Sequence, residues 1–426
     1  MTHRVASDVV VIGGGPAGLM AAIAAAETGA ATTLLEKGDR LGRKLGISGG
    51  GRCNVTNAKP LAELMENIPG NARFLHSALS RYNNQDIMGF FEGLGIALKE
   101  EDRGRVFPKT DKALTVVAAM VEAVREAGVQ VYLETPVRKL LSTEQQIHGV
   151  ELQGGQQLLT KAVVLATGGC SVPQTGSTGD GYPWAARLGH TIVQPFPTEV
   201  PLTSDDPHIV RRALQGLSFQ NVPLTVLDDQ NKRWTTETGD VLFTHFGLSG
   251  PAALRCSHYV SVALQKRPSA QLRVEMDLLP EEAGESFREQ WNHYRHTAPR
   301  KQVKTVLLDV LPERMVETIL ARSGIDGNVQ SAHLKNIDID LLERQVHHFP
   351  VRITGTLPLA KATVTGGGVS VRDIDPKTMA SKLCRGLYFA GEVMDVHAHT
   401  GGYNITVAFS TGRAAGASAA RYAIER

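Results

Sequence analysis

The apolar and polar positions at the start of the chain follow the pattern of a strand, a turn, a helix and a second strand. Residues 9–12 form an apolar run, residues 13–18 are rich in glycine, and an alanine-rich stretch continues to about Gly29. A second apolar run ends at Glu36. This succession is typical of a βαβ unit, in which two parallel strands are joined by a helix. The pattern therefore predicts an α/β fold.

The pattern changes further along the chain and divides it into four segments. The α/β pattern continues over residues 1–190, and residues 191–276 then show short β-branched runs between polar turns, which predict a mainly β insert. We expect a closing strand of this insert near residues 350–358. Over residues 277–349 apolar residues recur at helical spacing and prolines precede the expected helices, so we predict a small helical insert. Residues 359–426 return to the α/β pattern, and both chain ends are expected to form one domain.

Composition and charge narrow the choice of function. The 426 residues include 45 basic and 43 acidic side chains, a net charge of +2, which disfavours nucleic acid and anionic lipid as partners. The four cysteines lie far apart, and no apolar run approaches the roughly 18 residues of a membrane span. No secretory segment is recognisable before the first strand. We therefore expect a cytoplasmic protein with reduced thiols and no membrane segment.

The glycine-rich turn carries the strongest chemical signal. Gly13, Gly15 and Gly18 form a G-x-G-x-x-G pattern between the predicted strand and helix. In this setting the glycines allow a tight turn, close approach of a pyrophosphate and close packing of the helix on the strand. Glu36, at the end of the second strand, is placed to accept hydrogen bonds from ribose hydroxyls. The segment predicts a dinucleotide-binding site.

A second glycine-rich stretch combines small residues with positive charge. Arg43 and Arg52 flank a run of three glycines that ends at Gly51. Such a loop is suited to lie close to a flat, anionic ligand, with Arg43 or Lys44 on pyrophosphate. The hydrogen bonds to ribityl or flavin heteroatoms would come from Ser48, Arg52 or Asn54. Cys53 has Ala58, not a second cysteine, five residues later. We therefore exclude a dithiol relay at this position and expect Cys53 to pack as a small buried residue.

Two later strands end in turns that point toward the same chemistry. One is expected to end at Thr167, before Gly168, and the other at Glu392. Ligands of α/β sheets bind beyond such strand ends. A long helix is expected to start near Asn404 behind Gly402, and its N-terminus would stabilise negative charge on a reduced flavin. The histidines lack the spacing of metal ligands, so we predict no metal site.

Four stretches together resemble the BaiN-like (YhiN-type) flavoproteins of bacteria, a family of NAD(P)/FAD-dependent oxidoreductases related to the fumarate reductase flavoprotein group. In chain order they are GGGPAG, SGGGRCNVTN, LFTHFGLSGPA and GEVMDVHAHTGGYNITVAFSTG. The resemblance covers almost the whole chain. It implies an α/β fold with a Rossmann-type FAD-binding domain built from both chain ends, a β-barrel-like insert and a small helical insert.

The resemblance also implies which residues hold FAD. Residues 13–18 with Glu36, Lys37 and the backbone of Val137 would hold the adenosine and pyrophosphate half, and Ile405 would approach the flavin. Together with the residues named above, the predicted FAD contacts are Gly13, Gly15, Pro16, Ala17, Gly18, Glu36, Lys37, Gly42, Arg43, Ser48, Gly51, Arg52, Asn54, Val137, Thr167, Gly168, Gly391, Glu392, Gly402, Asn404 and Ile405. We find no His, Cys or Tyr motif for covalent attachment of the flavin and expect the FAD to be non-covalent.

The sequence favours an FAD-dependent oxidoreductase that takes electrons from NAD(P)H and reduces a carbonyl-conjugated small molecule through flavin N5. NAD(P)H would be a transient donor, because no second G-x-G-x-x-G is present. Two alternatives stay open: a flavin-based redox sensor that binds a partner, and a flavin-dependent tRNA-modifying protein, which the near-neutral charge disfavours. The candidate catalytic residues are Arg52, His245, His399 and Tyr403.

Overall fold

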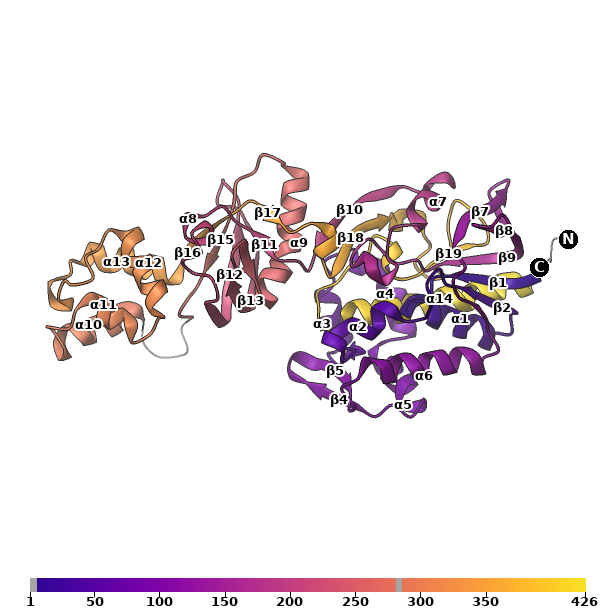
Figure 1. Ribbon diagram of the computed structural model, residues 1–426, viewed down its shortest axis with the longest axis horizontal. Coiled ribbons are helices and arrows are strands. Elements are labelled where there is room, and N and C mark those ends of the chain that lie inside the picture. The colour runs from indigo at the N-terminus through magenta and orange to yellow at the C-terminus, as the bar shows by residue number, and fades with distance from the viewer. Residues whose placement is uncertain (1–5, 281–285) are drawn as a thin grey trace. The chain divides into compact units, whose positions relative to one another are not determined.

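The computed structural model describes residues 6–280 and 286–426. Contacts along the chain divide it into two compact units. The first contains the chain up to Phe196 and from Leu359 onward, and the second runs from Pro197 to Pro358. The first unit thus joins sequence from both ends of the chain, drawn in indigo to magenta and in yellow (Figure 1). The separate helical insert over residues 277–349 stays a prediction, and residues 281–285 within it lie outside the described residues.

The first unit is built on a seven-stranded sheet in the order β6-β2-β1-β9-β8-β7, with β19 also paired to β9. Strands β6, β2, β1, β9 and β19 run parallel to one another, whereas β8 is antiparallel to β9 and β7 is antiparallel to β8. The bounds are β1 (Ala6–Ile12), β2 (Thr32–Leu35), β6 (Gln130–Tyr132), β7 (Val137–Thr143), β8 (Gln146–Leu152), β9 (Gln157–Leu165) and β19 (Leu387–Phe389). Residues 9–11 are fully buried, as expected for a parallel strand that is covered on both faces.

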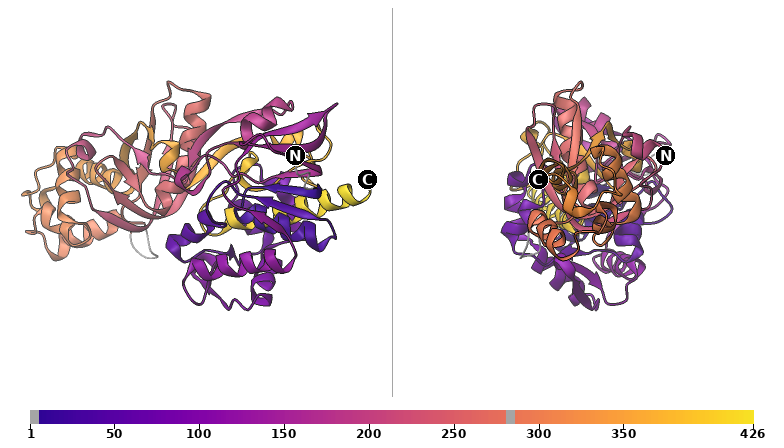
Figure 2. Two further views of the ribbon diagram at one scale, coloured as in Figure 1. Left: turned by 45° about the vertical axis from the view of Figure 1, so that its right-hand side comes forward. Right: turned by 90° about the vertical axis from the view of Figure 1, so that its left-hand side faces the viewer.

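Two helices from opposite ends of the sequence pack directly on each other in this unit. They are α1 (Pro16–Glu27) and α14 (Tyr403–Ile424), which lie side by side in Figure 1 and in the left view of Figure 2. A Cβ built at Gly412 would lie 2.4 Å from the carbonyl oxygen of Ala17, and one at Gly416 would lie 2.0 Å from that of Ala21. Only glycine permits this approach, so the two helix N-termini are fixed relative to each other.

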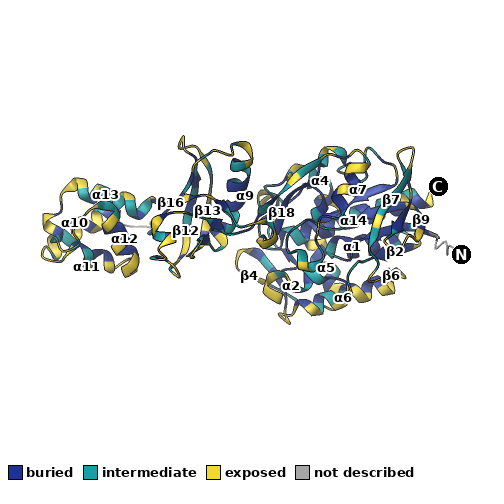
Figure 3. Ribbon diagram, turned by 45° about the horizontal axis from the view of Figure 1, so that its top comes forward, coloured by how far each residue is buried: buried dark blue, intermediate teal, exposed yellow. Residues whose placement is uncertain are grey.

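Shorter elements surround this core. Strands β3, β5 and β4 form a small antiparallel sheet next to the second glycine-rich stretch. In Figure 3 the central strands are dark blue and the outer turns of α6 are yellow. The bounds are α2 (Arg43–Gly51), β3 (Thr56–Asn57), α3 (Leu61–Glu66), α4 (Ala72–Arg81), α5 (Asn84–Gly93), β4 (Leu98–Glu101), β5 (Arg105–Pro108), α6 (Ala113–Glu126), α7 (Gly181–Arg187), β10 (Ile192–Thr198) and β18 (Val364–Val369).

The second unit contains a seven-stranded antiparallel sheet in the order β16-β15-β12-β13-β14-β11-β17. Strand residues such as Leu224 and helix residues such as Trp291 belong to one buried cluster. The bounds are β11 (Leu202–Thr203), α8 (Pro207–Val210), β12 (Ser218–Leu227), β13 (Arg233–Phe243), β14 (Gly247–Ser249), α9 (Pro251–Lys266), β15 (Leu272–Met276), α10 (Phe287–Thr297), α11 (Val303–Leu308), α12 (Glu313–Ser323), α13 (Asn336–His347), β16 (Phe349–Ile353) and β17 (Gly355–Thr356).

Three expected element boundaries differ from the structure. The strand expected to end at Glu392 ends at Phe389, because Gly391 has a left-handed φ of 73° and starts a short 3-10 turn. The strand expected to end at Thr167 ends at Leu165. The stretch expected to be a loop before Gly51 begins as helix α2 and departs from helical geometry at Ser48. Over residues 6–280 and 286–426, no helix has both the length and the apolar composition that a membrane crossing requires.

Candidate functional site

The three glycines of the first turn have different surroundings. A Cβ at Gly13 would lie 2.5 Å from the carbonyl oxygen of Ala166, and one at Gly18 would lie 1.8 Å from that of Gly13. These two positions must be glycine for the strand and helix to pack. A Cβ at Gly15 would meet no protein atom within 4 Å. The space in front of Gly15, at the N-terminus of α1, is open to a ligand, as a pyrophosphate site requires.

Glu36 lies directly after β2 and faces this turn. One carboxylate oxygen accepts a hydrogen bond from the backbone N–H of Gly14 at 2.7 Å, and the other accepts from that of Gly38 at 2.7 Å. A carboxylate has about four lone-pair sites, so roughly two stay available to ribose hydroxyls. The backbone N–H of Thr135 also donates to the carbonyl of Glu36, which brings the segment before Val137 to the same place.

The predicted cationic contacts are engaged with carboxylates. The Lys37 ammonium lies 2.5 Å from a carboxylate oxygen of Asp180 and 2.5 Å from the hydroxyl of Thr178. Arg43 donates to Asp39 through two of its nitrogens. Residues 178–180 were not predicted as part of the site, although they follow β9 along the chain. No local pattern predicts this pairing, because Lys37 and Asp180 are 143 positions apart.

Arg52 braces the second glycine-rich stretch. Its guanidinium pairs with Glu101 and Asp111, and its carbon centre lies 4.2 Å from the centroid of the Phe107 ring. The hydrogen bond to Glu101, followed in size of effect by the hydrogen bond to Asp111, raises the pKa of Arg52 above its usual value. The guanidinium therefore ties α2 to the small β3-β5-β4 sheet. Its assignment as a catalytic residue remains a prediction.

The end of this stretch offers an unused polar atom. The side-chain oxygen of Asn54 is buried and has no hydrogen-bond partner among the described residues. It would lie 2.9 Å from a Cβ built at Gly402, so the stretch adjoins the N-terminus of α14. The Ser48 hydroxyl instead donates to the carbonyl of Leu45 at 2.7 Å, and Gly51 is exposed. Asn54 is thus the better placed of the two polar candidates to contact a cofactor.

A polar network that the sequence did not reveal connects α2 with the turn after β19. The Lys44 ammonium lies 3.1 Å from one Glu392 oxygen. The other oxygen accepts from the backbone N–H of Thr365 at 2.7 Å and from the Ser171 hydroxyl at 3.2 Å. Burial raises the pKa of Glu392, but the charge of Lys44 and these hydrogen bonds outweigh it, so the pKa lies below its usual value. The carboxylate stays ionised beside Gly391.

The N-terminus of α14 is held by its own side chains. Asn404 accepts from the backbone N–H of Ala398 at 2.9 Å and donates to the carbonyls of Ala398 at 2.7 Å and His399 at 3.2 Å. His399 and Tyr403 are both buried at this end of the helix, and Ile405 is partly buried in its first turn. A Cβ at Gly402 would lie 2.4 Å from the carbonyl oxygen of Thr56. The helix start is therefore fixed against β3.

These contacts gather the predicted FAD residues of the first unit from distant parts of the sequence. Gly13 lies against the backbone of Ala166 and Thr167. A Cβ built at Gly391 would lie 2.8 Å from the Cβ of Ala17. The backbone N–H of Gly42 donates to the carbonyl of Gly14. The Thr167 hydroxyl, beside Gly168, is a second buried polar atom with no hydrogen-bond partner among the described residues. The open space at Gly15, two helix N-termini and these unused polar atoms fit FAD.

The remaining histidine candidate lies in the other unit. His245 is exposed in the turn between β13 and β14, where its ring lies edge-on to Phe246 at 4.9 Å between centroids. Its catalytic role stays a prediction. Within the described part of the chain, no three His, Cys, Asp or Glu residues gather as metal ligands would.

Cys53 is expected to be unreactive in the folded chain. Burial raises the pKa of its thiol to about 11, and the Ser48 hydrogen bond only partly opposes this effect. Because the thiolate is the nucleophile, iodoacetamide should not modify Cys53 at neutral pH until the chain unfolds. Mass spectrometry of labelled peptides, with and without denaturant, measures this directly. Rapid labelling of folded protein would contradict the burial of this thiol.

We expect the flavin to leave the chain when the protein is precipitated by acid, because no covalent attachment motif accompanies the site. The yellow colour should then remain in the supernatant and be recovered as FAD by chromatography. A yellow pellet would instead indicate attachment, and peptide mapping would then begin with His397, His399 and Cys53.

Comparison with known proteins identifies the family of this chain. The family model of the HI0933-like protein Rossmann domain matches residues 7–418 of this chain. A ribosomal RNA dihydrouridine synthase of Haemophilus influenzae is 33% identical over 419 residues, which cover 97% of this chain and 99% of that protein. A 3-dehydro-bile acid delta(4,6)-reductase of Clostridium scindens is 29% identical over 412 residues, or 96% of this chain and 98% of the relative.

Solved structures show the same fold at lower identity. An E. coli quinol fumarate reductase superposes on this chain with a TM-score of 0.53 at 17% sequence identity. The superposition covers 99% of this chain and 71% of the reductase chain. The predicted resemblance, the Rossmann-type FAD-binding fold and the enzyme class are confirmed. The chain belongs to the HI0933-like family and is a flavin-dependent oxidoreductase.

Proposed function

We propose that this chain reduces the C5–C6 double bond of a uracil base in ribosomal RNA, with electrons from NAD(P)H. The observation that carries the proposal is the end-to-end similarity to the Haemophilus influenzae ribosomal RNA dihydrouridine synthase, at 33% identity over 97% of this chain. A synthase of the same name from Escherichia coli is also 33% identical, over 407 residues.

The named activities of the relatives share one type of chemistry. The uracil double bond is conjugated to a carbonyl, and so is the 4,5 double bond of a 3-oxo steroid. In both, an acceptor carbon at the far end of the double bond takes a hydride while the carbonyl oxygen accumulates negative charge. The expectation of a carbonyl-conjugated acceptor therefore extends from a small molecule to a base in RNA. The net reaction is uridine, NAD(P)H and one proton giving dihydrouridine and NAD(P)⁺.

Bound FAD would accept the hydride of NAD(P)H and supply it to the base. The chain's own residues orient the cofactor and provide the proton. The open space at Gly15 and the carboxylate of Glu36 suit the pyrophosphate and ribose. The N-terminus of α14 would stabilise negative charge near the flavin pyrimidine ring, and His399 or Tyr403 at that N-terminus would hold the proton for C5.

The near-neutral net charge of the chain disfavours long-range attraction of RNA, but it does not exclude RNA binding. Net charge governs long-range attraction, whereas docking of RNA depends on local groups of basic side chains. The relatives that modify ribosomal RNA therefore carry more weight than the chain-wide difference of two charges.

We also propose the finer architecture as the basis of substrate choice. A β-barrel-like insert over residues 191–276, closed near 350–358, and a helical insert over residues 277–349 would separate acceptor recognition from FAD binding. The antiparallel sheet and the helices of the second unit support this division. Limited proteolysis of the FAD-loaded chain should cut between these parts before it cuts the first unit.

The deciding experiment is an anaerobic titration of the yellow protein with NADH and with NADPH, followed by mixing with protein-free ribosomal RNA from cells that lack this chain. Bleaching by a nicotinamide, recovery of colour on adding RNA, and a mass gain of one hydrogen molecule in a uridine nucleoside are expected. A parallel arm uses a 3-oxo-Δ4 steroid. Recovery with the steroid alone would favour a small-molecule reductase, and bleaching without any acceptor turnover would favour a redox sensor.

A further inference from the structure

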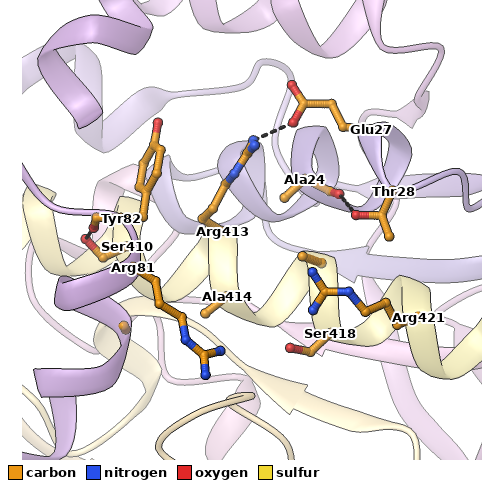
Figure 4. Close-up of a pocket in the computed structure, with 12 residues that line it drawn as sticks. Ala24, Glu27, Thr28, Arg81, Tyr82, Ser410, Arg413, Ala414, Ser418 and Arg421 are labelled. Atoms are coloured by element: carbon orange, nitrogen blue, oxygen red, sulfur yellow. Dashed lines mark hydrogen bonds and ion pairs between the residues drawn. The ribbon is translucent and has the colours of Figure 1, made fainter.

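A hollow of about 450 Å³ lies on the surface of the first unit where three helices meet (Figure 4). Helix α1 contributes Glu27 and the following Thr28, α4 contributes Arg81, and α14 contributes Arg413 and Arg421. All three helices belong to the same compact unit, so the hollow is defined without reference to the second unit. None of these residues was among the predicted FAD contacts.

The lining has an excess of positive charge, with three guanidinium groups and one carboxylate. Arg413 pairs with Glu27 at 2.5 Å and lies over the ring of Tyr82 at 5.4 Å, so its charge is largely compensated. Arg81 donates to the carbonyl of Lys377 at 3.1 Å, a contact that fixes the side chain without neutralising it. The guanidinium of Arg421 has no hydrogen bond or ion pair with another described residue. Two exposed guanidinium groups are therefore available to an anion.

The two available arginines reach the hollow from different helices. Arg81 ends α4, whereas Arg421 lies in the last turns of α14, with Ala414 and Ser418 of α14 in the floor (Figure 4). The guanidinium groups of Arg81 and Arg421 are carried by separate helices and line one hollow. Two such groups suit an anion that carries more than one phosphate better than a single phosphate. Small floor residues leave room for the sugar that joins the phosphates.

The hollow lies at the opposite end of α1 from the pyrophosphate space. Gly15 caps the start of α1 and Glu27 ends it, so roughly 18 Å of helix separates the pyrophosphate space from the hollow. A nicotinamide held at this distance on the outside of the helices would not reach the flavin. A ligand at the hollow therefore contributes to binding and placement and takes no part in hydride transfer.

We propose that Arg81 and Arg421 bind backbone phosphates of the RNA substrate and anchor it at a site remote from the flavin. The inference rests on the proposed function in one respect, namely that the substrate is RNA. Phosphate contacts set position and affinity and do not read sequence, so this hollow would hold RNA on either side of the modified base without selecting it.

The test compares the FAD-loaded wild type with the double variant Arg81→Gln/Arg421→Gln. Binding of protein-free ribosomal RNA is measured over a series of KCl concentrations. Each lost contact to a single strand should make the logarithmic salt slope shallower by about 0.7, so the variant should lose about 1.4 in slope and bind roughly 25-fold more weakly near 0.1 M salt. Arg81→Lys/Arg421→Lys should recover most of the slope, because lysine also neutralises phosphate.

The matched control is Arg73→Gln/Arg187→Gln, which removes the same charge from two exposed arginines of the first unit outside the hollow. It should bind RNA with nearly the wild-type slope. Equal RNA binding by the wild type and Arg81→Gln/Arg421→Gln, or no RNA binding by the wild type, would overturn the inference. Slower flavin reduction by NADPH in that variant would overturn it too, because it would show that the arginines serve the electron donor. A wild type that binds RNA through these arginines but reduces no uridine would overturn only the proposed function.

Discussion

Gly15→Val should give a folded chain that no longer binds FAD. A Cβ at this position meets no protein atom within 4 Å, and the backbone has an ordinary φ of −80°, so valine fits the chain itself. Its branched side chain would instead occupy the space where a pyrophosphate approaches the N-terminus of α1. We expect FAD affinity to fall at least about 100-fold, or roughly 3 kcal/mol. Flavin absorbance of the purified protein and calorimetric titration of the apoprotein measure this loss.

Two glycine variants separate binding from folding. Gly18→Ala would bring a Cβ within 1.8 Å of the carbonyl oxygen of Gly13, so it should lower the stability of the apoprotein by roughly 3 kcal/mol. Gly89→Val, at an exposed and open position of α5, should leave both FAD content and stability almost unchanged. Glu36→Ala should weaken FAD less than Gly15→Val does. Normal FAD content in Gly15→Val would show that the pyrophosphate is not bound at this turn.

Replacing the proton donor should slow reduction of the acceptor by roughly 10² to 10⁴-fold. The candidates in the first unit are His399 and Tyr403, which are 5% and 3% exposed and are held at the start of α14 by Asn404 and Gly402. We expect one of His399→Gln and Tyr403→Phe to show the large effect, because each keeps the size of the side chain and removes its proton-donating group. Stopped-flow mixing of the reduced enzyme with the acceptor measures the rate.

The reductive half-reaction is the internal control for this prediction. Bleaching of the flavin by NAD(P)H needs no proton at the acceptor carbon, so it should proceed at a similar rate in both variants and in the wild type. An equal loss in both half-reactions would indicate a displaced flavin rather than a missing proton. Full activity of both variants would exclude these two side chains and turn attention to His245 and Arg52.

Local sequence determined the elements that bind the nucleotide. A short apolar run before Gly13 and a longer, alanine-rich stretch after Gly18 favour a buried strand and a buried helix, because of their lengths, their composition and the glycines between them. The positions of Gly15 and Glu36 follow from that local geometry, since both lie within one βαβ unit. The resemblance of four separate motifs then identified the family and the cofactor, because each motif is a short, contiguous stretch.

Tertiary structure alone decided which distant side chains meet. Lys44 pairs with Glu392 across 348 positions, and Lys37 pairs with Asp180 across 143, through contacts that no periodicity encodes. The same holds for the hollow that contains Arg81 and Arg421, since only the packing of the folded unit brings α1, α4 and α14 together. Side-chain periodicity reports the burial of one helix or strand at a time. The partner of a charged group depends on how several helices and strands pack, and that packing is a property of the whole unit.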